Sequence, residues 1–238
     1  MKKIILLLTF IFICTFAFAQ KEHKTFYENG NLREEGKLDK EGNKTGKWKY
    51  YDYNNGALSI VGNYEKGWEV GEWKYYHTNG NLKEIENFEL SKKKGNIRVG
   101  ENKSYHFNGQ LQQSGQFDIK GEKSGVWKTY YDNGQLMQVI NYKNGKENGE
   151  RKFYWNDGTL QQVTPYKNGK ITGISKFYYG NGNLREAGSY KNNKAKGEWK
   201  FYYDNGQLKE VGNYKNDKRI GEWRTYNWKG EFIKTDKY

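Results

Sequence analysis

Hydrophobic and polar positions follow one pattern along most of the chain, and this pattern is written nine times. In a late copy, the β-forming residues 199–203 precede the turn sequence Asp-Asn-Gly at 204–206, and a second β-forming run ends at Tyr214. Two such runs around an Asn-Gly turn are typical of a β-hairpin. The opening motif Gly-x-Trp at Gly197 returns at Gly221, 24 residues later. A repeat of this length predicts stacked supersecondary units.

Three columns of residues keep the same register in all nine units. The first column holds the turn glycines Gly30, Gly56, Gly80, Gly109, Gly134, Gly158, Gly182, Gly206 and Gly230. Two residues after each glycine stands an apolar residue: Leu32, Leu58, Leu82, Leu111, Leu136, Leu160, Leu184, Leu208 or Phe232. Six residues further on stands Leu38, Tyr64, Phe88, Phe117, Tyr142, Tyr166, Tyr190, Tyr214 or Tyr238. Because no segment of the array shows a helix-length apolar period, we predict an all-β, elongated array of about nine antiparallel hairpins, in a single sheet or a solenoid.

The register within each hairpin depends on the length of its turn, and two registers stay open. A three-residue loop predicts the pairs Lys200–Glu210 and Tyr202–Leu208, which match opposite charges and apolar neighbours. A two-residue loop instead predicts that Trp199 lies opposite Gly212.

Composition supports a thin fold rather than one thick core. The chain is 34% hydrophobic and 17% aromatic, with a mean hydropathy of −1.14. Aliphatic residues are too few for a thick core, and aromatic residues are too many for a disordered chain. Aromatic rings suit a single sheet, because each covers about 150 to 250 Å² while its polar edge stays in water.

Residues 1–19 do not belong to the array and are predicted to be a cleaved signal peptide. Lys2 and Lys3 precede an apolar stretch, and the small residues around Ala19 fit a cleavage site. A membrane anchor is the alternative, but the stretch is shorter than the roughly 20 residues that a spanning helix needs. Residues 20–238 then form the array. The single cysteine, Cys14, would leave with the signal peptide, which predicts an exported bacterial protein without disulfides, located in the periplasm, on the outer surface or secreted.

The repeated motif resembles a known family. The run Gly-x-Trp-Lys-x-Tyr-x-x-Asn-Gly-x-Leu, followed by Tyr-x-Asn-Gly-Lys, is similar to the MORN repeat in its bacterial variant form, over residues 24–238. The resemblance implies an array of antiparallel hairpins that binds proteins or contacts membrane surfaces, and some bacterial variants act as antitoxins. It implies no catalytic residues. The units that open with Asn102, Arg151 and Ser175 in place of the tryptophan depart from the pattern.

Residues with catalytic or metal-binding chemistry are few. His77 and His106 occupy the same slot in adjacent units, but a metal site needs a third ligand, and both are interpreted as replacements for the tyrosine of other units. We therefore expect no metal and no cofactor. Recurrent glutamates are interpreted as cross-strand partners of lysines rather than a glycosidase pair, because equivalent repeats do not separate an acid from a base. They are Glu34, Glu84, Glu186 and Glu210.

Two further columns admit a binding role. A tyrosine column is interpreted as the packing ladder between hairpins, with the stacking of sugars or bases as the alternative; it comprises Tyr51, Tyr76, Tyr105, Tyr130, Tyr154, Tyr178, Tyr202 and Tyr226. A column of cations comprises Lys24, Lys49, Lys74, Lys103, Lys128, Lys152, Lys176, Lys200 and Arg224. The formal net charge of the chain is +13. Cations among aromatics suit nucleic acid, but export directs the chain away from it, so acidic envelope partners fit better. The alternative is that the lysines keep strand edges from aggregating.

These observations predict a non-enzymatic, exported interaction scaffold whose partner is a protein or an acidic envelope component, a lipid headgroup or a polysaccharide. The alternatives are an antitoxin that occludes a toxin and a glycan-processing enzyme. The middle units carry an insertion at 91–95 and lose three tryptophans, so we expect space and exposed polar groups there. They also hold glutamine in the glutamate slot, so we expect Lys103, Lys128 and Lys152 to lose their partners. The predicted partner-binding residues are Lys92, Lys93, Lys94, Lys103, Lys128, Arg151 and Lys152.

Overall fold

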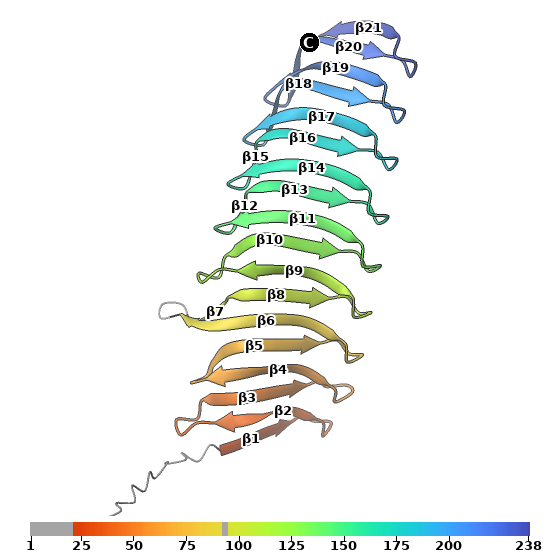
Figure 1. Ribbon diagram of the computed structural model, residues 1–238. Helices are drawn as coiled ribbons and strands as arrows, with labels where there is room; N and C mark the ends of the chain where they lie inside the picture. Colours follow the sequence, from red (N-terminus) through yellow and green to blue (C-terminus); the bar gives the residue numbers. More distant parts are fainter. Residues whose placement is uncertain (1–20, 92–94) are drawn as a thin grey trace, which may run out of the picture.

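The computed structural model describes residues 21–91 and 95–238, which form one antiparallel sheet of 21 strands. The long strands pair in sequence order, so the sheet is a continuous meander that rises from β1 to β21 (Figure 1). The short strands β7, β12 and β15 pair with β6, β11 and β14, which also pair with β8, β13 and β16. The strands are β1 (Lys21–Phe26), β2 (Leu32–Leu38), β3 (Lys44–Tyr51), β4 (Leu58–Glu65), β5 (Trp68–Tyr76), β6 (Leu82–Ser91), β7 (Gly95–Arg98), β8 (Gly100–Tyr105), β9 (Leu111–Phe117), β10 (Lys123–Tyr130), β11 (Leu136–Lys143), β12 (Lys146–Glu147), β13 (Gly149–Tyr154), β14 (Leu160–Lys167), β15 (Lys170–Ile171), β16 (Gly173–Tyr178), β17 (Leu184–Lys191), β18 (Lys194–Tyr202), β19 (Leu208–Lys215), β20 (Lys218–Tyr226) and β21 (Phe232–Lys237). The predicted all-β array of hairpins is confirmed, as one sheet.

The hairpins close through three-residue loops whose glycine has a left-handed backbone, except β3–β4, whose loop has one residue more. In the loop after β18, the backbone N–H of Gly206 donates to the carbonyl of Tyr203 at 3.0 Å, and the φ angle of Gly206 is 84°. This is a type I turn followed by a left-handed residue, the usual three-residue hairpin connection. The predicted pair Tyr202–Leu208 is confirmed.

A bulge next to this turn changes the rest of the register. Lys209 is an extra residue in β19, so Phe201 lies opposite Glu210 and Trp199 lies opposite Gly212. The pair Lys200–Glu210 predicted for a three-residue loop is therefore wrong, and Lys200 lies opposite Val211. Because side chains alternate across a strand, the bulge moves the glutamate column to the face opposite the lysine column.

Adjacent hairpins are held together by side chains that reach the next turn. Asn205 donates through Nδ2 to the carbonyl of Trp228, and its Oδ1 accepts from the backbone of Gln207. The hydroxyl of Tyr203 donates to the carbonyl of Tyr226. Equivalent bonds recur along the array, so the asparagine of the turn motif serves both its own loop and the next unit.

The core lies on one face of the sheet, here named the tryptophan face. It contains Trp48, Trp73, Trp127, Trp199 and Trp223, which are at most 5% exposed, together with the aromatic rings of the same strands. Each indole lies flat on a glycine of the preceding strand: a Cβ on Gly62 would come within 2.1 Å of Trp73. The absence of a side chain at this glycine is what lets a single-layer sheet bury a tryptophan.

Candidate functional site

The opposite side of the sheet, here named the lysine face, carries the predicted column of cations. Lys200 and Tyr202 lie on it, since they alternate with Trp199 and Phe201, whose rings stack on the tryptophan face. The face also presents the tyrosine column and the aliphatic residues opposite the lysines, all half-buried. No second layer of described residues covers it. Cations from successive units recur at every second strand, about 10 Å apart.

Most of these cations are already neutralised. A glutamate two residues earlier in the strand pairs with the cation in five units, as Glu72–Lys74, Glu101–Lys103, Glu150–Lys152, Glu198–Lys200 and Glu222–Arg224. In the first two units Glu35 serves both Lys24 and Lys49. The lysine face is thus largely a ladder of exposed ion pairs.

Lys128 and Lys176 are the exceptions within the described residues. Two residues before the cation, where most other units have glutamate, stand Val126 for Lys128 and Ile174 for Lys176. Neither ammonium group lies within 4.0 Å of a described carboxylate, and both lysines are exposed. Val126 and Ile174 are 48% and 57% exposed. Each position therefore combines an uncompensated cation with an exposed aliphatic side chain.

A shallow depression of about 450 Å³ adjoins Lys128 and Tyr130. It forms where Ser114 takes the slot that valine fills in several other units, and Glu101 also lines it. A similar depression near Arg224 is lined by two carboxylates, Glu198 and Glu222, and so has more negative than positive groups. The depression at Lys128 is the more suitable of the two for an acidic group.

The predicted central surface is not one surface. Lys103, Lys128 and Lys152 lie on the lysine face, whereas Arg151 lies on the tryptophan face, 3.3 Å from Glu147 and with its guanidinium 4.6 Å from the centre of the Phe153 ring. Consecutive strand residues point to opposite faces, so Arg151 and Lys152 cannot share a binding surface. Lys92, Lys93 and Lys94 lie outside the described residues.

The expected loss of partners in the middle units is also wrong for two lysines. Lys103 and Lys152 are paired with Glu101 and Glu150 at 2.8 and 3.1 Å. The glutamate-to-glutamine changes do not affect them, because that column lies on the tryptophan face. Lys176 was not among the binding residues predicted from the sequence, although it lacks a carboxylate partner among the described residues, as Lys128 does. The absence of glutamate two residues before Lys176 would have identified it.

The expectation that the missing tryptophans open space is wrong as well. Asn102 and Ser175 are 6% and 0% exposed. The glycine of the preceding strand is replaced at the same junctions, by Glu86 before Asn102 and by Thr164 before Ser175. The larger residues of the preceding strand fill the volume that an indole occupies elsewhere.

The replaced junctions bring new polar contacts into the core. Arg98 lies 2.7 Å from the buried carboxylate of Glu86. Burial raises the pKa of Glu86 above its ordinary value, while the guanidinium of Arg98 opposes that shift. The hydroxyl of Thr164 accepts from Gln162 at 2.6 Å. These contacts are structural substitutes for the indole and glycine pair.

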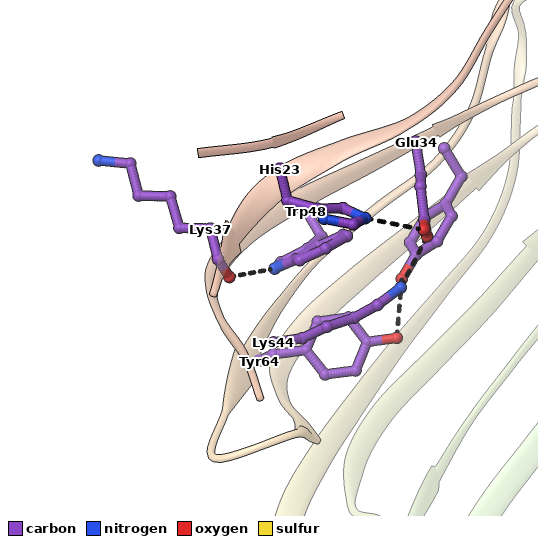
Figure 2. Close-up of polar contacts among 7 residues, drawn as sticks. His23, Glu34, Lys37, Lys44, Trp48 and Tyr64 are labelled. Atoms are coloured by element: carbon purple, nitrogen blue, oxygen red, sulfur yellow. Dashed lines mark hydrogen bonds and ion pairs between the residues drawn. The ribbon is translucent and has the colours of Figure 1, made fainter. Parts of the chain in front are cut away.

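The tryptophan face carries a polar cluster over Trp48, shown in Figure 2. The ammonium group of Lys44 lies 4.0 Å from the centre of the indole and donates to Glu34 at 2.7 Å and to Tyr50 at 3.0 Å. Lys123 and Arg219 cover Trp127 and Trp223 in the same way, at 4.0 and 3.9 Å. Glu34 has a lowered pKa, because Lys44 and His23 outweigh the opposing effect of burial. These cations cover the core, and Lys44 and Arg219 are already paired with Glu34 and Glu210.

His77 and His106 replace the tyrosine of other units, as interpreted from the sequence. The Nε2 atoms of His77 and His106 lie 3.0 Å from the carbonyls of Tyr105 and Tyr130, where other units place a tyrosine hydroxyl. Among the described residues no three His, Cys, Asp or Glu side chains are grouped to hold a metal ion. The described part of the chain also contains no helix long and apolar enough to cross a membrane.

Comparison with solved structures gives only distant likenesses. The crystal structures of TcdB2-TccC3-Cdc42, TcdB2-TccC3 and TcdB2-TccC3-TEV match at 14%, 13% and 14% identity with TM-scores of 0.19, 0.18 and 0.18. Each match covers 87% of this chain but only 14% of the other. TM-scores this low imply neither a shared fold nor a shared function. No curated protein matches the chain.

Comparison with protein families agrees with the columns of the sheet. The MORN repeat variant matches seven segments, at residues 20–42, 69–89, 98–118, 123–144, 147–168, 171–192 and 196–216. Together these segments cover more than half of the sequence and contain most of the turn asparagines, and both members of the junctions Gly115–Trp127 and Gly188–Trp199. The chain belongs to the MORN repeat variant family.

Proposed function

We propose that this protein is an exported, non-enzymatic scaffold that binds a partner protein on its lysine face. The proposal rests on the different roles of the two faces of the sheet. The tryptophan face is used for packing, whereas the lysine face keeps half-buried tyrosines and aliphatic residues open to solvent along the array. Partly exposed aromatic and aliphatic side chains bordered by polar groups are typical of an interaction site.

The charge pattern favours a protein over a polyanion as the partner. A polysaccharide or lipid surface would be attracted by a row of free cations, but most cations here are paired with glutamate. Free cations remain at Lys128 and Lys176, each beside an exposed aliphatic residue. A protein that presents carboxylates next to apolar side chains at matching places fits this pattern.

The proposal of export rests on residues 1–19, which lie outside the described residues. Their basic start, apolar stretch and small residues before Gln20 are the pattern of a signal peptide. Cleavage after Ala19 would leave every described strand intact, since β1 begins at Lys21.

Affinity capture from the envelope fraction of the native organism tests the proposal. The doubly neutralised chain Lys128→Gln/Lys176→Gln should retain much less of the partner than the unchanged chain. The matched control Lys74→Gln/Lys200→Gln removes the same charge from cations that are paired with glutamate, and it should retain most of the partner. Equal losses in both chains would show that only diffuse charge matters, and bound polysaccharide or lipid without protein would contradict a protein partner.

A further inference from the structure

The two edge strands of the sheet have one free side each among the described residues. β1 pairs with β2, and β21 pairs with β20. Tyr238 exchanges both backbone hydrogen bonds with Gly221, at 3.0 and 3.1 Å. Because hydrogen-bonded and non-hydrogen-bonded positions alternate in an antiparallel ladder, the backbone groups of Thr235 and Lys237 point outward from β21. This edge can accept another strand.

Every internal junction of the array follows one rule. A tryptophan is present only where the preceding strand supplies a glycine, as in Gly36–Trp48, Gly62–Trp73, Gly115–Trp127, Gly188–Trp199 and Gly212–Trp223. Where the glycine is missing, the tryptophan is missing too, as in Glu86–Asn102, Ile140–Arg151 and Thr164–Ser175. The two positions are therefore selected together.

The two edge strands follow the same rule if β1 is placed next to β21. In β21 the glycine slot holds Asp236, which leaves no room for an indole, and in β1 the tryptophan slot holds His23. Continuing the register of β19 and β20 would place Asp236 beside His23. An aspartate and a histidine can share a hydrogen bond at this place, whereas a tryptophan would clash.

The neighbouring positions are compatible as well. The same register sets Lys234 opposite Thr25 and Thr235 opposite Lys24, so no like charges meet. Phe26 and Phe232 are 61% and 59% exposed, although the Tyr and Leu residues of their columns are half-buried inside the array. A further strand at each edge would cover them as the next unit does elsewhere.

We propose that a second copy of this chain adds its β1 to β21, so that protomers stack head to tail into one continuous sheet. The contact is heterologous, since the two edges are different surfaces. A heterologous contact that does not close produces open-ended assemblies rather than a dimer. The partner on the lysine face would then meet a longer repeating surface.

Disulfide trapping tests the register of this contact. Residues 20–238 contain no cysteine, because the single cysteine is Cys14. Lys234 and Thr25 would form a non-hydrogen-bonded pair, whose short Cα separation suits a disulfide. A chain with Lys234→Cys, mixed with a chain with Thr25→Cys under mild oxidation, should give a linked heterodimer. The control Thr235→Cys places the thiol on the other face and should not link to Thr25→Cys; no link in the first mixture, or equal links in both, would overturn the proposal.

Sedimentation of residues 20–238 over a concentration series tests the mode of assembly. The average mass of the unchanged chain should rise past two protomers. Thr235→Pro removes a backbone N–H that points outward, so it should leave the β20–β21 pairing intact and hold the chain at one protomer. Thr235→Ala should assemble like the unchanged chain, and circular dichroism melts confirm that each variant is folded. A monomer at all concentrations, a mass that stops at two protomers, or assembly that survives Thr235→Pro would each contradict the proposal.

Discussion

The two faces of the sheet differ in what their side chains do, although they are built from alternate residues of the same strands. On the tryptophan face each core indole lies on a glycine, and three of the five also lie under a cation, as Trp223 lies between Gly212 and Arg219. On the lysine face the side chains stay half-exposed, and the cations face solvent. We therefore expect substitutions on the tryptophan face to change stability and substitutions on the lysine face to change binding.

The largest effect is expected from removing an interior indole. Trp73→Ala deletes a ring that is 2% exposed and contacts Tyr64 and Phe88. We expect a loss of about 3–5 kcal/mol in the free energy of unfolding, as for other buried aromatic residues. Urea denaturation followed by tryptophan fluorescence and circular dichroism measures it. A loss below that of the exposed Trp228→Ala would show that the tryptophan face is not the core.

The glycines under the indoles should be nearly as sensitive. In Gly62→Ala the new methyl group would come within 2.1 Å of Trp73, so the ring must shift. Overpacking of this kind typically costs about 1–3 kcal/mol. Gly180→Ala is the matched control, because no atom lies within 4 Å of its methyl group and its φ is not positive. Equal denaturation midpoints for the two variants would refute the close packing of glycine and indole.

A double substitution sharpens the comparison within the tryptophan face. Ser175→Trp alone should destabilise the array, because Thr164 occupies the space of the ring. Thr164→Gly alone leaves a cavity. The double variant Thr164→Gly/Ser175→Trp recreates the junction of other units, so the two changes should couple favourably by about 0.5–3 kcal/mol in a double-mutant cycle. Additive losses would mean that the two positions are independent.

A smaller effect is expected from pH on the lysine face. Glu35 accepts hydrogen bonds from the hydroxyl of Tyr51 and from Lys49, which lower its pKa from 4.5 to about 2. A carboxylate with a depressed folded pKa stabilises the fold above its unfolded pKa and loses that contribution as the pH falls through the folded pKa. Stability should thus fall between about pH 4.5 and 2 by at most about 1 kcal/mol, because solvent still screens this half-buried group. Glu35→Gln should flatten this part of the midpoint-against-pH curve, and an unchanged slope would contradict it.

Much of the fold could be predicted from the sequence, because the turn glycines and the aromatic columns keep one register through all units. The separation of Arg151 from Lys152 could also have been predicted, since side chains alternate along a strand. The bulge at Lys209 could not, because the turn sequence does not specify an extra residue after the loop. This bulge places the glutamates of that column on the tryptophan face, so most lysines pair instead with the glutamate two residues earlier in their own strand.

Hydroxyl-radical labelling of tyrosines, with and without the captured partner, tests most directly whether the two faces have separate roles. Both faces carry half-buried tyrosines that serve as reporters: Tyr130 and Tyr178 on the lysine face, Tyr142 and Tyr190 on the tryptophan face. We predict that the partner protects Tyr130 and Tyr178 and leaves Tyr142 and Tyr190 unchanged. Protection of Tyr142 and Tyr190, with Tyr130 and Tyr178 still labelled, would contradict it.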